Sequence, residues 1–190
     1  MTETQTREEL ARYGRELWDR RLVTGSSGNL SARLQDGTLL VTPASRSLRD
    51  LAPHELVHTD ANGTALDGGT PTSELPLHVA CYRTRRDISC VIHTHPTFCV
   101  VWSKMGRVFE QDTVGARETL GPVTWTPYRP PGTTELADVV AEAAGSFDTI
   151  VMERHGLSVL AQTLERAFLL SDLAEEAARV AFFTKFLLPQ

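Results

Sequence analysis

Apolar residues recur at helical spacing along several stretches of the chain, with charged residues between them. Residues 4–22 show this pattern clearly and predict an amphipathic helix near the N-terminus. The other helices are expected over residues 73–86, 97–104, 133–144 and 163–187. Threonine or serine residues precede most of these stretches, as is typical of helix N-caps.

Short apolar runs bounded by turn residues predict the strands. Residues 30–34 and 39–41 flank an Asp-Gly turn and form one predicted hairpin, and residues 56–59 and 64–66 form a second. Further strands are expected over residues 88–93, 123–127, 149–153 and 157–160. Hairpin-paired strands with helices between them predict an α/β fold with a largely antiparallel or mixed sheet. We expect one domain over residues 1–190.

Composition narrows the class of protein. The chain is 41% hydrophobic and 23% charged, which is typical of a globular protein. Its formal net charge of −5 disfavours binding to nucleic acid or to a membrane surface. There is no apolar run of about 18 residues and no signal-peptide pattern. Three cysteines without a C-x-x-C motif fit a reducing compartment, so we expect a cytoplasmic protein.

Three histidines at strand ends are candidate metal ligands. His93 and His95 end a predicted strand two positions apart, so both side chains point to one face of the sheet. His155 follows another strand and precedes Gly156, which permits a close backbone approach. Three neutral imidazoles with an open fourth position are typical of a catalytic zinc site. The alternatives stay open that the pair arises by chance and that His155 is a packed or surface residue.

Residues 54–58 read His-Glu-Leu-Val-His, which matches the H-E-x-x-H motif of zinc proteases. That motif needs a helix, yet Pro53 precedes it and a turn follows it directly, so we expect a turn that enters a strand. A metalloprotease is therefore disfavoured. His78 lies four residues after Glu74 on one helix face, and a packed or surface position is favoured over a role behind the metal.

Three polar segments are candidate anion sites. Residues 25–29 form a Gly- and Ser-rich loop whose backbone N–H groups suit a phosphate, although the loop matches no nucleotide-binding motif. Residues 71–74 open a helix whose free N–H groups also favour phosphate. Residues 42–45 are a weaker third candidate. Taken singly, an ordinary loop, helix cap or turn explains each segment.

Five short segments occur in a fixed order along the chain. They are G-S-S-G-N-L-S-A-R at 25–33, V-T-P-A-S at 41–45, P-T-S-E at 71–74, V-I-H-T-H-P at 91–96 and R-H-G-L at 154–157. Together they resemble the class II aldolase/adducin head family, over residues 7 to 185 or so.

This resemblance implies a three-layer α/β/α fold around a central, mostly antiparallel sheet, in a homotetramer. It also implies Zn²⁺, or another divalent metal, held by His93, His95 and His155, with Glu74 as the catalytic carboxylate. The phosphate-binding positions of the family fall on Gly28, Asn29, Thr72 and Ser73 and, more weakly, on Ala44 and Ser45.

The implied activity is retro-aldol cleavage of a ketose 1-phosphate, of the fuculose type, to dihydroxyacetone phosphate and an aldehyde. A divalent ion can stabilise the resulting enediolate as a Lewis acid. A nearby carboxylate can move the proton, and a phosphate cradle can orient the substrate. The expected partner is thus a small phosphorylated sugar.

The chain also departs from the family pattern. Ala44 and Ser45 stand where the archetypal aldolases carry Thr-Gly. The tyrosine acid of those aldolases falls at Thr113, and the chain ends before the tail that brings another tyrosine. The proton donor to the leaving aldehyde is therefore unassigned, with Asp112 and Tyr128 as candidates.

Two alternative functions follow from the same resemblance. A 3-oxo-tetronate 4-phosphate decarboxylase is similar around residues 25–33 and 128–132, but that branch carries Lys before the catalytic Glu, whereas Ser73 here favours an aldolase. An adducin-like binding module would keep the fold without catalysis. The intact set of three histidines and Glu74 argues against the binding module.

Overall fold

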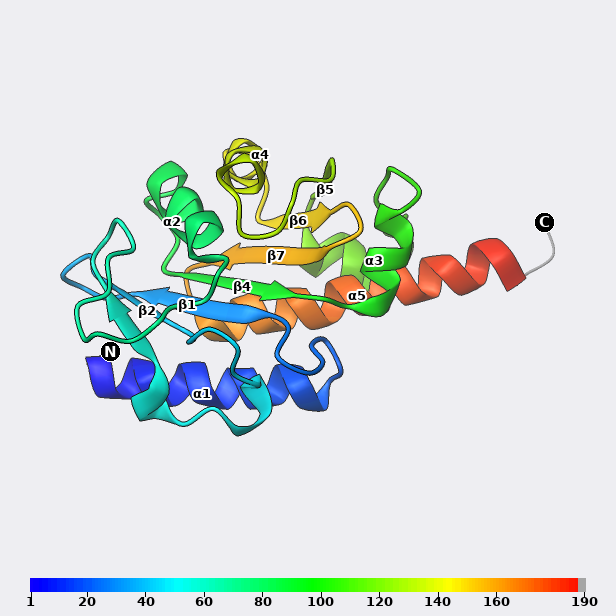
Figure 1. Cartoon of the computed structure of the whole chain (residues 1–190). Coiled ribbons are helices and arrows are strands. Elements are labelled where there is room, and N and C mark those ends of the chain that lie inside the picture. Colours follow the sequence, from blue (N-terminus) through cyan, green and yellow to red (C-terminus); the bar gives the residue numbers. More distant parts are fainter. Residues whose placement is uncertain (188–190) are drawn as a thin grey trace.

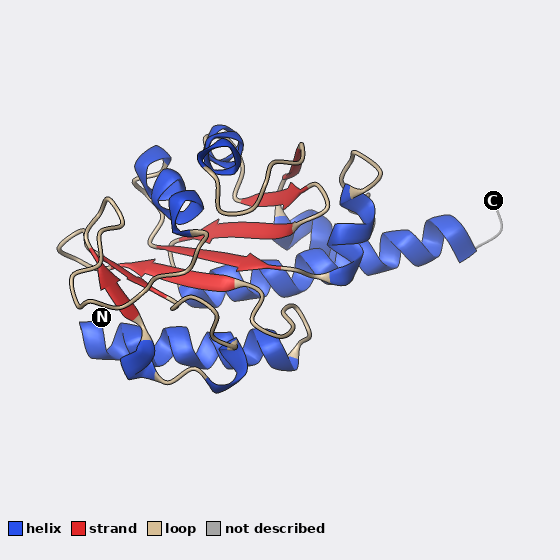
Figure 2. Ribbon diagram, in the orientation of Figure 1, coloured by secondary structure: helices blue, strands red, loops and turns tan. Residues whose placement is uncertain are grey.

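The computed structural model describes residues 1–187, and its centre is a seven-stranded sheet with the order β3-β2-β1-β4-β7-β6-β5 (Figures 1 and 2). All neighbouring strands run antiparallel except β5 and β6, which are parallel. The strands are β1 (Asn29–Arg33), β2 (Leu39–Val41), β3 (Val57–Thr59), β4 (Cys90–Thr94), β5 (Val123–Thr126), β6 (Thr149–Met152) and β7 (Gly156–Ala161). The expected mixed, mostly antiparallel sheet is confirmed.

Helices cover both faces of this sheet and confirm the three-layer α/β/α fold (Figure 1). Helices α2 and α4 lie on one face, while α1 and α5 lie on the other, and α3 packs against α5. The helices are α1 (Glu3–Asp19), α2 (Leu75–Thr84), α3 (Thr97–Ser103), α4 (Thr134–Ala144) and α5 (Leu164–Leu187). Among residues 1–187, no helix has the length and apolar character that crossing a bilayer requires.

The central strand β4 shows how the sequence builds these layers. Its residues are all buried, because successive side chains point to opposite faces and both faces are covered. Ile92 joins the core under α1 and α5, whereas its neighbour Val91 joins the core under α2 and α4. The strand thus packs between two apolar cores, and His93 lies near its C-terminal end.

The second predicted hairpin is only half correct. Strand β3 forms, but residues 64–66 do not form a strand, and only Ala65 makes an isolated bridge to Thr59. Ala65 packs against the core under α2 and α4, but Leu66 is 56% exposed. The return segment therefore buries only one small side chain, and its pairing does not extend into a strand.

The H-E-x-x-H segment forms no α-helix, as expected. A short 3-10 turn over Pro53–Glu55 leads into β3, so the two histidines share no helix face. The Nε2 atom of His58 lies 2.8 Å from the hydroxyl of Thr38, which directly precedes the neighbouring strand β2. This segment therefore cannot bind zinc in the manner of a zincin.

Candidate active site

Four side chains from three parts of the fold converge at one end of the sheet. His93 and His95 lie at and just beyond the end of β4, and His155 lies in the turn between β6 and β7. Glu74 is the N-cap residue of α2. Register explains the convergence, because β4 and β7 pair with His93 opposite Ser158, so that the turn carrying His155 reaches the end of β4.

The distances between these groups suit a metal centre. His93 Nε2 lies 2.8 Å from Glu74 Oε2 and 2.9 Å from His95 Nε2, and His155 Nε2 lies 3.1 Å from Glu74 Oε1. One ligand atom from each of the four residues lies within 4.8 Å of every other. The set could hold a metal ion through three imidazoles and a carboxylate.

The arrangement of lone pairs supports this fit. His93 Nδ1 lies 3.1 Å from the carbonyl oxygen of Leu157, so in the neutral imidazole Nδ1 carries the proton and Nε2 is an acceptor. That acceptor faces a carboxylate oxygen and a second imidazole nitrogen. A cation among these atoms would remove their mutual repulsion, which is what a ligand set requires.

The charge states suit the same chemistry. Burial alone would raise the pKa of Glu74, but the charges of His93 and His155 and their hydrogen bonds hold it well below its usual range. Glu74 is therefore ionised. Burial, together with the charge of the neighbouring imidazoles, lowers the pKa of His95 to about 3. His95 is thus neutral at physiological pH, the form in which an imidazole binds a metal.

Gly156 allows the histidines to approach one another. A Cβ atom at this position would overlap the carbonyl oxygen of Thr94 and lie 3.0 Å from His95 Cδ2 and 3.1 Å from His93 Cε1. Next to His155, Arg154 adopts a left-handed conformation with φ of 57°, and its N–H donates to the Ser103 hydroxyl. The tight turn that presents His155 thus depends on one glycine and on one strained residue.

A hollow of about 240 Å³ opens beside the cluster. Glu74, His95 and His155 line it, and so do all of the residues predicted to bind phosphate. These are Gly28, Asn29, Ala44, Ser45, Thr72 and Ser73. The three candidate anion segments are therefore brought together with the candidate metal ligands, although the sequence separates them widely.

Some polar groups around the hollow already form hydrogen bonds, and others are free to bind a ligand. The backbone N–H groups of Ala44 and Thr72 donate to the carbonyl oxygens of Thr70 and Thr42. Across the described chain, the hydroxyls of Ser26, Ser45 and Ser73 make no hydrogen bond, and all three residues are exposed. These hydroxyls are accordingly the donors best placed to reach an anion.

A buried polar network behind Glu74 was not expected from the sequence. His78 is fully buried, and its Nε2 and Nδ1 atoms lie 2.5 Å from Asn29 Oδ1 and 2.6 Å from Ser31 Oγ. Asn29 Nδ2 in turn donates to Glu74 Oε2 over 3.3 Å, and the Tyr82 hydroxyl lies 2.8 Å from Ser31 Oγ. His78 therefore lies directly behind the cluster rather than serving as a simple packing residue.

The sequence carries only the local part of this network. The spacing of Glu74, His78 and Tyr82 predicts that they share one helix face, because residues four and eight positions apart lie on the same side of a helix. Asn29 and Ser31 share one strand face for the same kind of reason.

The candidate proton donors lie elsewhere. Asp112 forms an exposed ion pair with Arg117 at 3.3 Å, and Tyr128 is 45% exposed. Among the described residues, Pro131 lines the hollow, but neither Asp112 nor Tyr128 does. The proton donor therefore stays unassigned.

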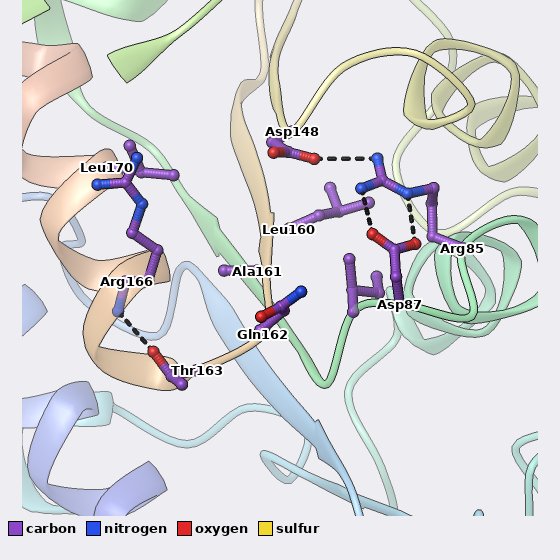
Figure 3. Close-up of a pocket in the computed structure, with 10 residues that line it drawn as sticks. Arg85, Asp87, Asp148, Leu160, Ala161, Gln162, Thr163, Arg166 and Leu170 are labelled. Carbon is purple, nitrogen blue, oxygen red and sulfur yellow. Dashed lines mark hydrogen bonds and ion pairs between the residues drawn. The ribbon is translucent and has the colours of Figure 1, made fainter. Parts of the chain in front are cut away.

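A larger hollow of about 290 Å³ lies near the other ends of β4 and β7 (Figure 3). Arg85 borders it, but its guanidinium group is bound to Asp87 at 2.7 Å and to Asp148 at 2.9 Å. Arg166 also lines this hollow and donates to the carbonyl oxygen of Thr119 over 2.7 Å. No histidine of residues 1–187 lines it, so it lacks the metal ligands found beside Glu74.

Comparison with known proteins agrees with this geometry. The L-fuculose phosphate aldolase of Methanococcus maripaludis is 33% identical over 175 residues, which cover 92% of this chain and 94% of that protein. The 3-oxo-tetronate 4-phosphate decarboxylase of Escherichia coli (strain K12) is 32% identical over 185 residues, covering 95% and 87%.

A crystal structure of an Escherichia coli protein described as an aldolase, epimerase or decarboxylase superposes with a TM-score of 0.89 at 31% identity, covering 99% of this chain and 93% of that one. The family model of the class II aldolase and adducin N-terminal domain matches residues 8–182. The chain therefore belongs to the class II aldolase and adducin N-terminal domain family and is one of its enzymes.

Proposed function

We propose that this enzyme is a zinc-dependent sugar-phosphate aldolase that cleaves a ketose 1-phosphate, of the fuculose type, to dihydroxyacetone phosphate and an aldehyde. The observation that carries the proposal is the shared hollow, in which candidate metal ligands and candidate phosphate donors lie side by side. A phosphorylated substrate could thus place its reacting carbons at the histidines while its phosphate lies in the loops.

Zinc suits a site of three imidazoles and one carboxylate, and His93, His95 and His155 would hold it. When bound, the ion would act as a Lewis acid for the negative charge that carbon–carbon cleavage leaves on the substrate. Glu74 is the carboxylate that lines the hollow, and it is ionised. In this role, a Glu74 oxygen would accept the hydroxyl proton of the carbon that becomes the aldehyde and later return a proton to the three-carbon product.

The phosphate end of the substrate would meet neutral donors. No lysine or arginine lines the hollow within residues 1–187. The hydroxyls of Ser45 and Ser73, with the backbone N–H group of Gly28, would therefore bind the phosphate, and the Asn29 side chain would border it. Ala44 and Thr72 would shape this cradle rather than donate their backbone N–H groups, which are already bonded.

A second candidate function is decarboxylation of a 3-oxo-tetronate 4-phosphate. The Escherichia coli relative with this activity in its name supports it, because its identity to this chain nearly equals that of the aldolase relative. Loss of carbon dioxide would leave the same kind of enediolate at the same cluster. Ser73 before Glu74 is the residue that favours the aldolase.

One experiment separates these functions. Zinc-loaded protein is incubated with a panel of ketose 1-phosphates that includes fuculose 1-phosphate, and separately with a 3-oxo-tetronate 4-phosphate. Dihydroxyacetone phosphate is followed by its enzyme-coupled reduction, and carbon dioxide is measured in parallel. A His93→Ala variant purified in the same way controls for contaminating enzymes.

We expect dihydroxyacetone phosphate from at least one ketose and no carbon dioxide. Carbon dioxide alone would establish the decarboxylase, and the release of neither product by zinc-loaded protein would overturn both functions.

We further propose that residues 1–190 form one domain that assembles into a homotetramer in the cytoplasm. Two apolar cores that share one sheet support the single domain. Three free, buried cysteines support a reducing compartment. Sedimentation equilibrium would test the tetramer, and a monomer across the micromolar range would exclude it.

A further inference from the structure

We propose that His78 is a positioning residue, which acts with Ser31 and Tyr82 to hold the Asn29 amide in the one orientation that donates to Glu74. This inference takes the role of Glu74 from the proposed function, whereas the hydrogen bonds of the network are present in the structure whatever that role is. The three residues and Asn29 lie between α2 and β1, beneath the hollow, and each is at most 5% exposed.

The hydrogen bond between Asn29 and Glu74 determines the direction of the other hydrogen bonds in this network. Asn29 donates from Nδ2 to Glu74 Oε2 and turns Oδ1 toward His78. Because Oδ1 can only accept, His78 carries its proton on Nε2, 2.5 Å away. A rotated Asn29 amide would place two acceptors against each other at Glu74.

The remaining hydrogen bonds of the network, which lie farther from Glu74, follow in the same way. The fully buried His78 is neutral, so Nδ1 is an acceptor and the Ser31 hydroxyl donates to it over 2.6 Å. Ser31 then accepts from the Tyr82 hydroxyl over 2.8 Å. Each bond fixes the next, and all of them point from Tyr82 toward the carboxylate.

The consequence for the site is a fixed carboxylate plane. Glu74 Oε2 is held between Asn29 Nδ2 and His93 Nε2, while Oε1 faces His155. Without the donor on His78, the Asn29 amide is free to rotate, and Oε2 loses one of its two partners. The ligand cluster would then keep its histidines but lose the defined orientation of its base.

The matched variants differ in what they remove. His78→Leu removes the donor to Asn29, while His78→Gln restores an N–H that can reach Asn29 Oδ1. Ser31→Ala removes the hydroxyl that fixes the imidazole, with little change in volume. Val79→Ala is the control, because Val79 is the buried neighbour of His78 on α2 and its side chain is apolar.

The first measurement needs no substrate. The side-chain amide resonances of Asn29 are recorded by ¹⁵N–¹H correlation in the zinc-loaded protein and assigned with an Asn29→Asp variant. We expect a shifted, slowly exchanging pair in the wild type and in Val79→Ala. We expect this signature to be lost in His78→Leu, weakened in Ser31→Ala and recovered in part in His78→Gln.

The second measurement is turnover on the substrate identified for the wild type. His78→Leu is expected to lower kcat by about 10–100-fold with KM within a few-fold of wild type, and His78→Gln to recover part of the loss. An unchanged Asn29 signature in His78→Leu, or in Ser31→Ala if His78→Leu does not fold, would overturn the inference. If the wild type shows no lyase activity, the proposed function fails while the amide spectrum still decides this inference.

Discussion

Glu74 could act as a base or as a metal ligand, and one substitution distinguishes these two roles. If it serves as the base rather than as an essential ligand, Glu74→Gln keeps zinc on three histidines and loses proton transfer. We expect about one zinc per chain and a kcat lowered by about 10²–10⁴-fold. Metal analysis and steady-state turnover on the same preparation measure both quantities. Loss of zinc together with activity would instead assign Glu74 as a required ligand.

Gly28 provides a second test at the level of one residue. It has φ of 78°, and a Cβ atom there would overlap Val23 Cγ1 and lie 3.0 Å from the carbonyl oxygen of His93. Backbone strain and overpacking together should make Gly28→Ala lower the free energy of unfolding by about 2–4 kcal/mol and raise KM. Urea denaturation and substrate titration provide the readouts.

Gly25 is the matched control in the same loop. Its φ is 58°, but a Cβ atom there would meet nothing within 4 Å. Gly25→Ala should therefore show only the backbone cost of about 1–2 kcal/mol. Equal losses in the two variants would mean that the close approach of Gly28 to β4 has no energetic consequence.

At the scale of the elements, the C-terminal end of α1 includes a strained residue, Arg21, whose replacement should relieve the strain. The N–H groups of Arg21 and Leu22 donate to the carbonyl oxygens of Trp18 and Leu17, the pattern of a Schellman cap, and Arg21 has φ of 60° where glycine is usual. Arg21→Gly should raise the free energy of unfolding by about 0.5–1 kcal/mol, since relieved strain exceeds the added chain entropy.

Urea denaturation of Arg21→Gly beside Arg20→Gly tests this cap. Arg20 has ordinary right-handed geometry, so glycine there should destabilise the protein. A loss of stability in both variants would show that the side chain of Arg21 contributes more than its backbone costs.

Glu175 links two elements and makes stability depend on pH. Its carboxylate, on α5, accepts from the N–H groups of Phe98 and Cys99 at the start of α3. Burial raises its pKa above the ordinary value of 4.5, against the lowering effects of those bonds and of Arg179. The folded protein therefore binds this proton more tightly than the unfolded chain, so stability falls as pH rises from 4.5 through the raised pKa.

Glu175→Gln removes this titration and keeps an oxygen acceptor for α3. The difference in unfolding free energy, wild type minus variant, should decrease across that interval and then stay constant. Urea denaturation from about pH 4 to about pH 8 measures it. A difference that increases with pH would show that the hydrogen bonds to α3 outweigh the cost of burial.

In the whole molecule, features that depend on local periodicity could be predicted from the sequence, and contacts between distant elements could not. The two-residue period of a strand places His93 and His95 on one face whatever surrounds them, and apolar spacing places the helices. The contact of His78 with Asn29 could not be predicted, because it depends on α2 packing across β1, which no local pattern encodes. Residues 64–66 show the opposite case, in which a strand pattern is present but buries too little apolar surface to form a strand.

Metal binding should affect the kinetics of unfolding more than those of folding. The candidate ligands converge only after β4 has paired with β1 and β7, which are distant in sequence, so they are expected to be incomplete in the folding transition state. Zinc at about 100 times its dissociation constant should stabilise the protein by about 2.7 kcal/mol, chiefly by slowing unfolding. Folding and unfolding rates with zinc and with a chelator test this, and faster folding with zinc would contradict it.

The pairing of β4 with β7 also has a consequence for synthesis on the ribosome. The nascent chain exposes His93 and His95 well before His155 and β7 have been made, and the N-terminus of α3 receives its carboxylate partner only from Glu175. A partly synthesised chain therefore carries the two histidines without the third ligand or the strand that aligns them. Insertion of a metal at this candidate site is therefore expected only after nearly the whole polypeptide has been translated. A chain released from the ribosome before β7 would lack part of the candidate ligand set, which added metal could not replace.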